Sequence, residues 1–278
     1  LFSQRGIVFH KTEREIRTRG ALRYGSFEMD GNISSQFVTG LLFALPLLEG
    51  DSRVVLRPPV ESRSYIDMTI SALKMFGVES GWQEDNVIYI KGNQRYRADE
   101  VFVEGDYSNA AFFEALNLLG GQVKIENLRK DSLQGDRVCE DLFEALKRPG
   151  AELDLSDCPD LGPVLFAAAA AKYGGKFTGT SRVKIKESNR GEAMAEELRK
   201  FGATVEVSEN EVIVGRQGLR APEEVLNGHN DHRIVMSEAV LLTQTGGTID
   251  GAEAVSKSFP DFFEKLASLG IEVERIEN

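Results

Sequence analysis

The sequence has few cysteines, no long apolar run and no surplus of positive charge, and each absence excludes a class of protein. Only Cys139 and Cys158 occur, in no metal-ligand or Cys-x-x-Cys spacing, so a disulfide framework is not expected and the cytoplasm is the simplest location. The longest apolar stretch, around residues 166–171, is far too short to span a bilayer. The net charge of −11 repels nucleic-acid phosphate and anionic lipid, so neither nucleic acid nor membrane is an expected partner.

The start of the chain lacks a methionine and a signal peptide. It opens on Leu1, and no charged segment is followed by an apolar one. Residues 1–8 are typical of the interior of a protein, so we expect an N-terminally truncated chain. With 278 residues, of which 41% are hydrophobic, the chain is long enough for one large domain or two modest ones.

Four segments share one plan, and this repeat is the main organising feature of the sequence. Each has a short strand, a polar turn opening an apolar helix, a second strand, a second helix and one or two further strands. The equivalent turns lie at Ser34, Ser108, Asp160 and His232, at steps of about 74, 52 and 72 residues. The second unit is therefore roughly 20 residues short, and the gap falls at residues 147–150, where a hairpin is expected. Either this family member is trimmed there or the sequence carries an internal deletion.

Periodicity predicts the individual elements of an α/β fold. Apolar spacing of three and four predicts helices over residues 34–48, 65–76, 108–119, 163–172, 190–201, 233–243 and 259–269. Alternating β-branched residues predict strands over residues 51–56, 87–90 and 271–276, a hairpin over 205–214, and strands beginning at Phe27, Val101, Leu153 and near Val225. The polar stretch 94–99 is the predicted linker, which gives a first domain over residues 1–97 and a second over 98–278.

Candidate functional residues gather at two equivalent places in each unit, the turn before the first helix and the turn before the second. The first set is Ser34, Ser35, Gln36, Ser108, Asn109, Asp160, Asp231, His232 and Arg233. The second set is Ser62, Tyr65, Ser132, Lys186, Glu187, Arg190 and Lys257. Helix N-termini present unpaired N–H groups and partial positive charge, and Arg and Lys add full charges. These turns therefore predict a site for phosphorylated or carboxylated ligands.

Each of these residues also has a plainer interpretation. The serines before the helices and Asp160 are equally the residues expected at N-caps. Lys186, Glu187 and Arg190 equally fit a solvated helix face with local ion pairs. The run 231–233 is harder to explain in this way, because cations at a helix start oppose the helix dipole unless they hold an anion.

Six motifs, in order along the chain, resemble the 5-enolpyruvylshikimate-3-phosphate synthases. They are Gly-Asn-Ile-Ser-Ser-Gln-Phe at 31–37, Glu-Ser-Arg-Ser-Tyr-Ile-Asp-Met-Thr at 61–69, Cys-Pro-Asp at 158–160, Lys-Glu-Ser-Asn-Arg at 186–190, Asp-His-Arg at 231–233 and Lys-Ser-Phe-Pro-Asp at 257–261. The resemblance implies a two-domain inside-out α/β barrel of the enolpyruvyl transferase type. Each domain is built from strand-helix-strand-helix-strand repeats and closes on substrate, and the first domain is incomplete here.

The resemblance also implies a reaction and a set of roles. The enzyme transfers the enolpyruvyl group of phosphoenolpyruvate to the 5-hydroxyl of shikimate 3-phosphate and releases phosphate, in aromatic amino acid biosynthesis. Shikimate 3-phosphate would contact Ser34, Ser35, Gln36, Ser62, Asp160 and Lys186, with Tyr65 close by. Phosphoenolpyruvate would contact Gln36, Arg190, Arg233 and Lys257. Asp160 would be the base on the hydroxyl, and Glu187 would pass a proton to and from the methylene carbon.

The implied chemistry needs no metal or organic cofactor, and the sequence shows no ligand cluster for a metal. A monomer is expected. The chain departs from the family in lacking its opening repeats and in carrying Asn189 where many members have Asp. We therefore expect this chain alone to be inactive or nearly so.

Two other functions stay open at the level of sequence. A UDP-N-acetylglucosamine enolpyruvyl transferase has a similar reaction, but it favours a reactive loop cysteine, and the motifs at 34–36 and 186–187 suit shikimate better. A non-catalytic anion-binding fragment or paralogue is the alternative of a different class. Pairing of Asp160 with Glu187 distinguishes the enzymes from it, because binding alone needs neither carboxylate.

Overall fold

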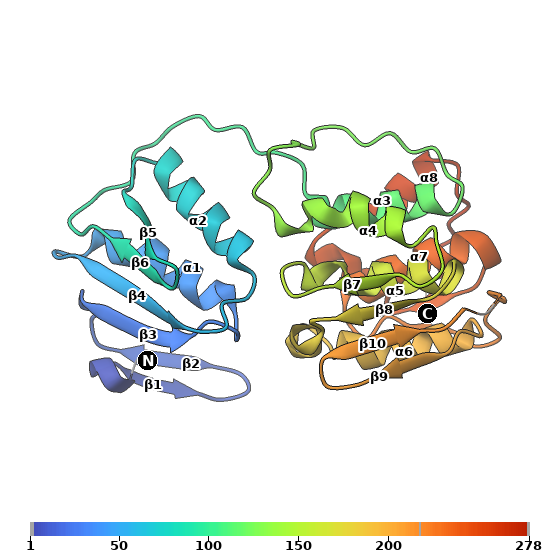
Figure 1. Ribbon diagram of the computed structural model, residues 1–278, viewed down its shortest axis with the longest axis horizontal. Coiled ribbons are helices and arrows are strands. Elements are labelled where there is room, and N and C mark those ends of the chain that lie inside the picture. Colours follow the sequence, from blue (N-terminus) through green and yellow to red (C-terminus); the bar gives the residue numbers. More distant parts are fainter. Residues whose placement is uncertain (1–2, 217, 277–278) are drawn as a thin grey trace. The chain divides into compact units, whose positions relative to one another are not determined.

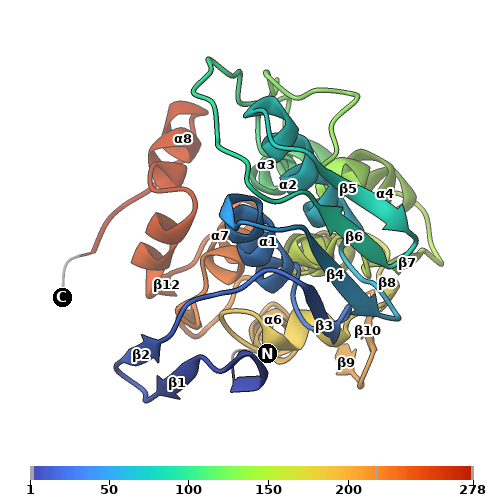
Figure 2. The same cartoon turned by 90° about the vertical axis from the view of Figure 1, so that its left-hand side faces the viewer.

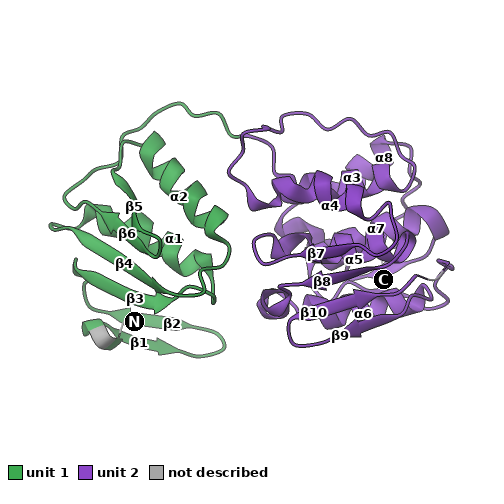
Figure 3. Ribbon diagram, viewed as in Figure 1, with its two compact units in different colours: residues 1–103 green, residues 104–278 purple. Residues whose placement is uncertain are grey.

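The computed structural model describes residues 3–216 and 218–276 and divides the chain into two compact units (Figure 1). Unit 1 spans residues 1–103 and unit 2 spans residues 104–278 (Figure 3). The division falls a few residues after the polar stretch 94–99, in a segment without helix or strand. Each unit has its own hydrophobic core.

Unit 1 contains one complete repeat. Its strands are β3 (Ser26–Asp30), β4 (Ser52–Arg57), β5 (Ser80–Glu84) and β6 (Val87–Ile90), and its helices are α1 (Ser35–Ala44), continued by the 3-10 turn η2 (Leu45–Leu47), and α2 (Arg63–Met75). The sheet order is β3-β4-β6-β5, with β3 parallel to β4 and both β4 and β5 antiparallel to β6. Burial alternates along β4, where Val54 and Leu56 point into the core with Phe27, as expected for a sheet with one covered face.

Unit 2 contains another complete repeat, the third along the chain, with the same topology. Its strands are β7 (Glu152–Asp154), β8 (Gly175–Thr178), β9 (Val205–Val207) and β10 (Glu211–Val214), and its helices are α5 (Gly162–Ala171) and α6 (Arg190–Lys200). The order β7-β8-β10-β9 again combines a parallel pair with an antiparallel hairpin. The shared strand order confirms the predicted plan for these two repeats, including the hairpin over 205–214.

The other two repeats of unit 2 keep their helices but have little or no sheet. The second repeat has α3 (Tyr107–Leu118), the 3-10 turn η3 (Gly135–Val138) and α4 (Cys139–Ala145). The fourth has β11 (Leu226–Asn227), α7 (His232–Thr245), β12 (Ile249–Asp250), the 3-10 turn η6 (Ala252–Lys257) and α8 (Phe262–Ser268). Among the described residues of these two repeats, only β11 and β12 pair, over two residues each.

The strands predicted at Val101 and over 271–276 are wrong, because these described residues form neither helix nor strand. In the complete repeats a hairpin completes the parallel pair. No described hairpin follows α4 or α8, and two short strands without further partners are marginal in water. Phe102 and Val103 are accordingly 73% and 78% exposed.

A hairpin near the start of unit 1 was not predicted. Strands β1 (Val8–Lys11) and β2 (Ile16–Arg19) pair in an antiparallel two-stranded sheet, after the 3-10 turn η1 (Ser3–Arg5). Figure 2 shows this hairpin set apart from the four-stranded sheet. All eight strand residues are exposed, so the segment has no buried face to produce an alternating pattern.

Helix α5 is the centre of unit 2. Every residue from Gly162 to Ala170 is buried, which is the pattern of a helix surrounded by other elements. Its small alanine side chains allow α3, α6 and α7 to pack closely around it. The starts of these helices are thereby brought near one another. No helix among the described residues is long and apolar enough to cross a membrane.

Candidate functional site

The repeat topology places the predicted turns at one edge of each sheet. In both complete repeats, the two strands that precede helices are parallel. The carboxyl ends of parallel strands meet at the same sheet edge, so the turns that follow them are neighbours. Ser34 and Ser62 thus share an edge in unit 1, and Asp160 and Lys186 share one in unit 2.

In unit 1, Ser34, Ser35 and Gln36 begin α1. Ser34 is the N-cap, and its Oγ accepts a hydrogen bond from the Gln36 backbone N–H at 3.3 Å. Ser35 is 9% exposed, whereas Gln36 is exposed. The N-cap interpretation of Ser34 is therefore confirmed. This cap does not require the side chains of Ser35 and Gln36.

The second turn of unit 1 presents Ser62 in an uncommon conformation. Ser62 precedes α2 with φ of 50°, is 2% exposed and makes no side-chain capping bond. Its loop is tied to the first turn by two backbone bonds, from Gly31 N to the Arg57 carbonyl at 2.9 Å and from Glu61 N to the Gly31 carbonyl at 3.2 Å. A left-handed serine is strained, and such residues cluster at functional sites.

In unit 2, Asp160 is surrounded by cations from three elements. It lies in the 3-10 turn η4 (Pro159–Leu161) that leads into α5. Its Oδ1 accepts from Arg190 Nη1 at 2.8 Å and pairs with Lys186 Nζ at 3.1 Å, and its Oδ2 accepts from Arg233 Nη2 at 3.3 Å. Asp160 is thus an ion-pairing residue rather than a helix cap.

Burial and charge act in opposite directions on Asp160. Burial by itself would raise the pKa of its carboxyl, but Arg233, Lys186 and Arg190 together outweigh burial and hold the pKa well below its ordinary value. An anion that drew these cations toward itself would raise the pKa again. The strength of Asp160 as a base therefore depends on whether an anion is bound to these cations.

Arg190 is the most deeply buried member of the site, with its side chain 1% exposed. Besides Asp160, it donates to Asp231 Oδ2 from Nε at 2.8 Å and to Glu187 Oε2 from Nη2 at 2.5 Å. Burial would lower the pKa of Arg190, but Asp231, Asp160 and Glu187 outweigh it, and the guanidinium stays charged. The interpretation of residues 186–190 as a solvated helix face is wrong.

The two terminal nitrogens of the Arg233 guanidinium differ in their hydrogen bonding. Its Nη2 donates to Ser108 Oγ at 3.2 Å and to Asp160, whereas its Nη1 is buried without a hydrogen-bond partner among the described residues. A buried unpaired guanidinium nitrogen is costly, and a bound anion would satisfy it. The Arg233 backbone N–H donates to Oδ1 of Asp231 at 3.0 Å, and Asp231 is the N-cap of α7.

The remaining predicted residues lie around this cluster. Lys257 Nζ donates to Asn230 Oδ1 at 2.8 Å and to the Asn230 carbonyl, in the loop that enters α7. Glu187 is 42% exposed and is the most accessible carboxylate on Arg190. Burial, aided by the charge of Arg233, lowers the pKa of His232, which favours a neutral ring at the helix start.

Sequence reasoning missed Asp136, which is 3% exposed and accepts a hydrogen bond from Ser108 Oγ. Burial, followed by the charge of Asp160, raises the pKa of its carboxyl to about 6. A signal was available: Asp136 follows Ser132 in the turn before a second helix, the place that carries Lys186 and Arg190 in the next repeat.

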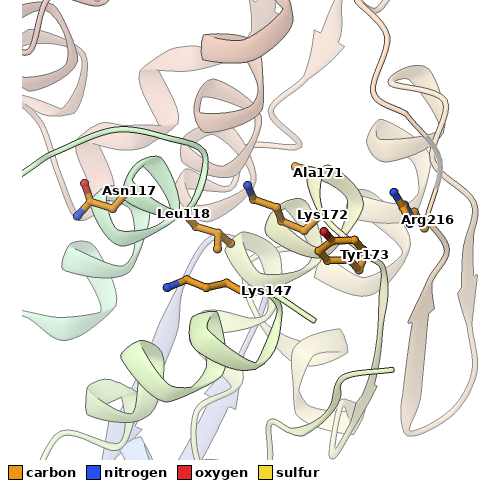
Figure 4. Close-up of a pocket in the computed structure, with 7 residues that line it drawn as sticks. All are labelled: Asn117, Leu118, Lys147, Ala171, Lys172, Tyr173 and Arg216. Carbon is orange, nitrogen blue, oxygen red and sulfur yellow. The ribbon is translucent and has the colours of Figure 1, made fainter. Parts of the chain in front are cut away.

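A hollow of about 400 Å³ in unit 2 lies away from these residues (Figure 4). It is lined by Asn117, Leu118, Lys147, Ala171, Lys172, Tyr173 and Arg216, at the C-terminal ends of α3, α4 and α5. Cations at helix C-termini are stabilised by the helix dipole, and the Arg216 guanidinium lies 4.8 Å from the Tyr173 ring centre. The lining is therefore explained without a ligand, and none of the predicted site residues belongs to it.

One group of acidic and histidine side chains outside the site has a spacing suited to a metal. It consists of Glu196, Glu197 and His229, whose ligand atoms lie within 4.8 Å of one another. Both carboxylate oxygens of Glu197 already pair with Lys200 Nζ, at 3.0 and 2.9 Å. Lys200 therefore supplies the positive charge that a metal ion would otherwise supply to Glu197.

The family model for EPSP synthase (3-phosphoshikimate 1-carboxyvinyltransferase) matches residues 7–148 and 140–266. The two matched stretches meet in the second repeat, where the expected hairpin is absent. The 3-phosphoshikimate 1-carboxyvinyltransferase of Clostridium acetobutylicum is 39% identical, over 98% of this chain and 68% of its own length. That of Brachyspira hyodysenteriae is 36% identical, over 98% of this chain and 70% of its own.

Solved structures show the same fold. The EPSP synthase of Acinetobacter baumannii superposes with a TM-score of 0.77 at 24% identity, over 98% of this chain and 69% of its own. The enolpyruvyl transferase NikO of Streptomyces tendae superposes with a TM-score of 0.69 at 16% identity, over 98% and 70%. These likenesses confirm the inside-out α/β fold of the enolpyruvyl transferases. On the sequence matches, this chain belongs to the EPSP synthase (3-phosphoshikimate 1-carboxyvinyltransferase) family.

Proposed function

We propose that Asp160, Lys186, Glu187, Arg190, Arg233 and Lys257 carry the family's enolpyruvyl transfer, with Ser34, Ser35, Gln36 and Ser62 holding shikimate 3-phosphate. The observation that carries the proposal is the buried Nη1 of Arg233, which has no partner among the described residues and belongs to one of the three cations on Asp160. Such a group of cations suits a doubly charged ligand such as phosphoenolpyruvate. In this proposal the protein works as a monomer in the cytoplasm.

The order of events follows from which ion pairs are easiest to exchange. Glu187 is the most exposed carboxylate on Arg190, so a ligand carboxylate replaces it at the lowest desolvation cost. Its release frees Glu187 to pass a proton to and from the methylene carbon. In the same step the ligand draws Arg233 away from Asp160. The pKa of Asp160 then rises, and the carboxylate becomes a better base for the 5-hydroxyl.

The cations have a second role after attack of the hydroxyl. The tetrahedral intermediate carries carboxylate and phosphate charge, and Arg190, Arg233 and Lys257 would stabilise both until phosphate leaves. Arg190 and Arg233 are held in place before any ligand arrives, so little reorganisation is needed. No observation favours a UDP-N-acetylglucosamine substrate, and the carboxylate pair on Arg190 argues against a purely anion-binding protein.

Asp160→Asn tests the assignment of the base. Binding of each substrate by calorimetry is measured beside phosphate release. We expect phosphate release to fall at least about 100-fold, because a general base contributes this much. Phosphoenolpyruvate binding should be kept or strengthened, because a negative charge has left a group of cations.

Asp250→Asn, which changes an exposed carboxylate in β12 of the same unit, is the matched control and should change neither quantity. Unchanged phosphate release by Asp160→Asn would show that another group is the base. Arg233→Ala should instead weaken phosphoenolpyruvate binding by about 2–5 kcal/mol, because it removes a desolvated partner of the anion.

A further inference from the structure

Asp136 is linked to the proposed site through one intervening residue, Ser108. Its Oδ2 accepts from Ser108 Oγ, and the same Ser108 Oγ accepts from Arg233 Nη2 at 3.2 Å. Ser108 is 5% exposed and Asp136 3% exposed, so no bulk water competes for these bonds. Ser108 thus links Asp136 to Arg233, one of the proposed ligand-binding groups.

A serine hydroxyl can point its hydrogen in any of several directions, and its partners decide which. A carboxylate can only accept, so an ionised Asp136 obliges Ser108 to donate to it. The Ser108 lone pairs are then left for Arg233. With Nη2 held by Ser108 and Asp160, Arg233 keeps its Nη1 unpaired and in place.

The segment that carries Asp136 is itself fixed to the start of α3. Gln134 Oε1 accepts from the Tyr107 backbone N–H at 2.8 Å, and Gln134 Nε2 donates to the Gly105 carbonyl at 2.8 Å. The Ser108 backbone N–H donates to Asp106 Oδ1 at 2.9 Å. Both ends of the Asp136–Ser108 bond therefore belong to one rigid corner.

We infer that Asp136 is a positioning residue for the reaction: through Ser108 it fixes the Arg233 guanidinium so that Nη1 faces the bound anion. The inference rests on the proposed function, in which Arg233 binds phosphoenolpyruvate. Above about pH 7, Asp136 is mostly a carboxylate, because its pKa is raised only to about 6. The hydrogen bonds that link Asp136 through Ser108 to Arg233 are thus complete under ordinary assay conditions.

The test combines a shape-preserving variant with a direct view of the arginine. In Asp136→Asn at pH 8, the amide N–H₂ can donate to Ser108, which releases the hydroxyl hydrogen toward Arg233. We expect the dissociation constant for phosphoenolpyruvate to rise about tenfold, the loss of one charge-assisted hydrogen bond, with shikimate 3-phosphate affinity unchanged. A purely electrostatic role predicts the opposite sign, because the variant removes a negative charge near an anion site.

Three further variants separate positioning from folding. Ser108→Ala should weaken phosphoenolpyruvate binding to the same degree, and Asp136→Asn with Ser108→Ala should be no worse than either single variant. Ser108→Thr, which keeps the hydroxyl, should restore most of the affinity. Glu140→Gln removes an exposed carboxylate from the same segment and should change nothing. Additive losses in the double variant would overturn the inference.

Side-chain nitrogen NMR of Arg233 distinguishes failure of this inference from failure of the proposed function. In the wild type the two Nη groups should give separate resonances, and Asp136→Asn should merge them through faster rotation of the guanidinium. A merged signal with unchanged phosphoenolpyruvate affinity would keep the positioning role and refute the assignment of Arg233 to that ligand. An unchanged signal would refute the positioning role, whatever the affinity.

Discussion

At the scale of single residues, Glu238 conflicts most strongly with its surroundings. It lies within α7, is 0% exposed, and neither carboxylate oxygen has a hydrogen-bond partner among the described residues. Burial, followed by the charge of Glu197, raises the pKa of Glu238 to about 9. The group is therefore a neutral acid in the folded protein at neutral pH, whereas in the unfolded chain it is ionised.

This difference makes a prediction for stability. Because the folded-state pKa lies above the unfolded value, the folded state binds the extra proton between about pH 4.5 and pH 9. The free energy of unfolding therefore falls as pH rises through that window, by about 3 kcal/mol at pH 7. Glu238→Leu, similar in size and without the charge, should be more stable than the wild type by a margin that grows across the window.

Urea unfolding at a series of pH values measures this predicted pH dependence of the stability difference between Glu238→Leu and the wild type. Glu238→Gln is the control, because it keeps a polar group but does not titrate, and its difference from the wild type should follow the same pH dependence. A difference between Glu238→Leu and the wild type that stays constant from pH 5 to pH 9 would show that Glu238 is ionised in the folded protein.

Residue-level prediction from the sequence succeeded where the cause was local. The cap at Ser34 was recognisable, because a cap acts on the next two or three residues. Asp136 could not be recognised in this way. Its importance comes from Ser108 and Arg233, which are 125 residues apart and meet only in the folded chain.

At the scale of elements, Gly31 joins the two turns of unit 1. A Cβ at this position would lie 2.9 Å from the Pro59 carbonyl oxygen and 3.0 Å from Val60 Cγ2. The close approach lets the β3–α1 turn and the loop before α2 exchange backbone hydrogen bonds. The motif at 31–37 thus begins with a glycine for a steric reason.

Gly31→Ala should lower the free energy of unfolding of unit 1 by about 1–3 kcal/mol, the usual cost of inserting a methyl group into packed atoms. Gly40→Ala is the matched control in the same unit, because Gly40 is an exposed helical glycine with nothing within 4 Å of its Cβ position. It should raise stability by about 0.5–1 kcal/mol. Urea unfolding measures both, and equal effects would contradict the steric role of Gly31.

The elements also show why some strands could be predicted and others could not. The segments at 87–90 and 205–214 alternate in β-branched residues and form strands as expected. The segments at 101 and 271–276 have similar composition but lack hairpin partners in the described chain. A strand depends on neighbours that its own residues do not reveal.

At the scale of the whole molecule, the two units have separate cores. All buried residues of the smaller core, from Phe27 to Ile90, lie in unit 1, and all those of the larger core, from Tyr107 to Leu266, lie in unit 2. A smaller core buries less apolar surface per residue and gives a smaller margin of stability. The repeat count in the sequence indicated this asymmetry, because unit 1 has one complete repeat.

The chain should therefore unfold in urea in two steps, with unit 1 unfolding first. Trp82 is the single tryptophan and lies in unit 1, with its indole N–H donating to Asp67 Oδ1 at 2.6 Å. Its fluorescence reports on unit 1, whereas far-ultraviolet circular dichroism is dominated by the helices of unit 2. We expect the fluorescence midpoint to lie at a lower urea concentration than the main dichroism transition.

Phe166→Ala separates the two transitions. Phe166 is 0% exposed in α5, and its ring centre lies 4.8 Å from that of Phe177, so its truncation should cost unit 2 about 3–5 kcal/mol. The dichroism midpoint should then fall toward, or below, the fluorescence midpoint, which should not move. If both midpoints shift together, the two units fold as one cooperative body, and the separate cores do not act as separate folding units.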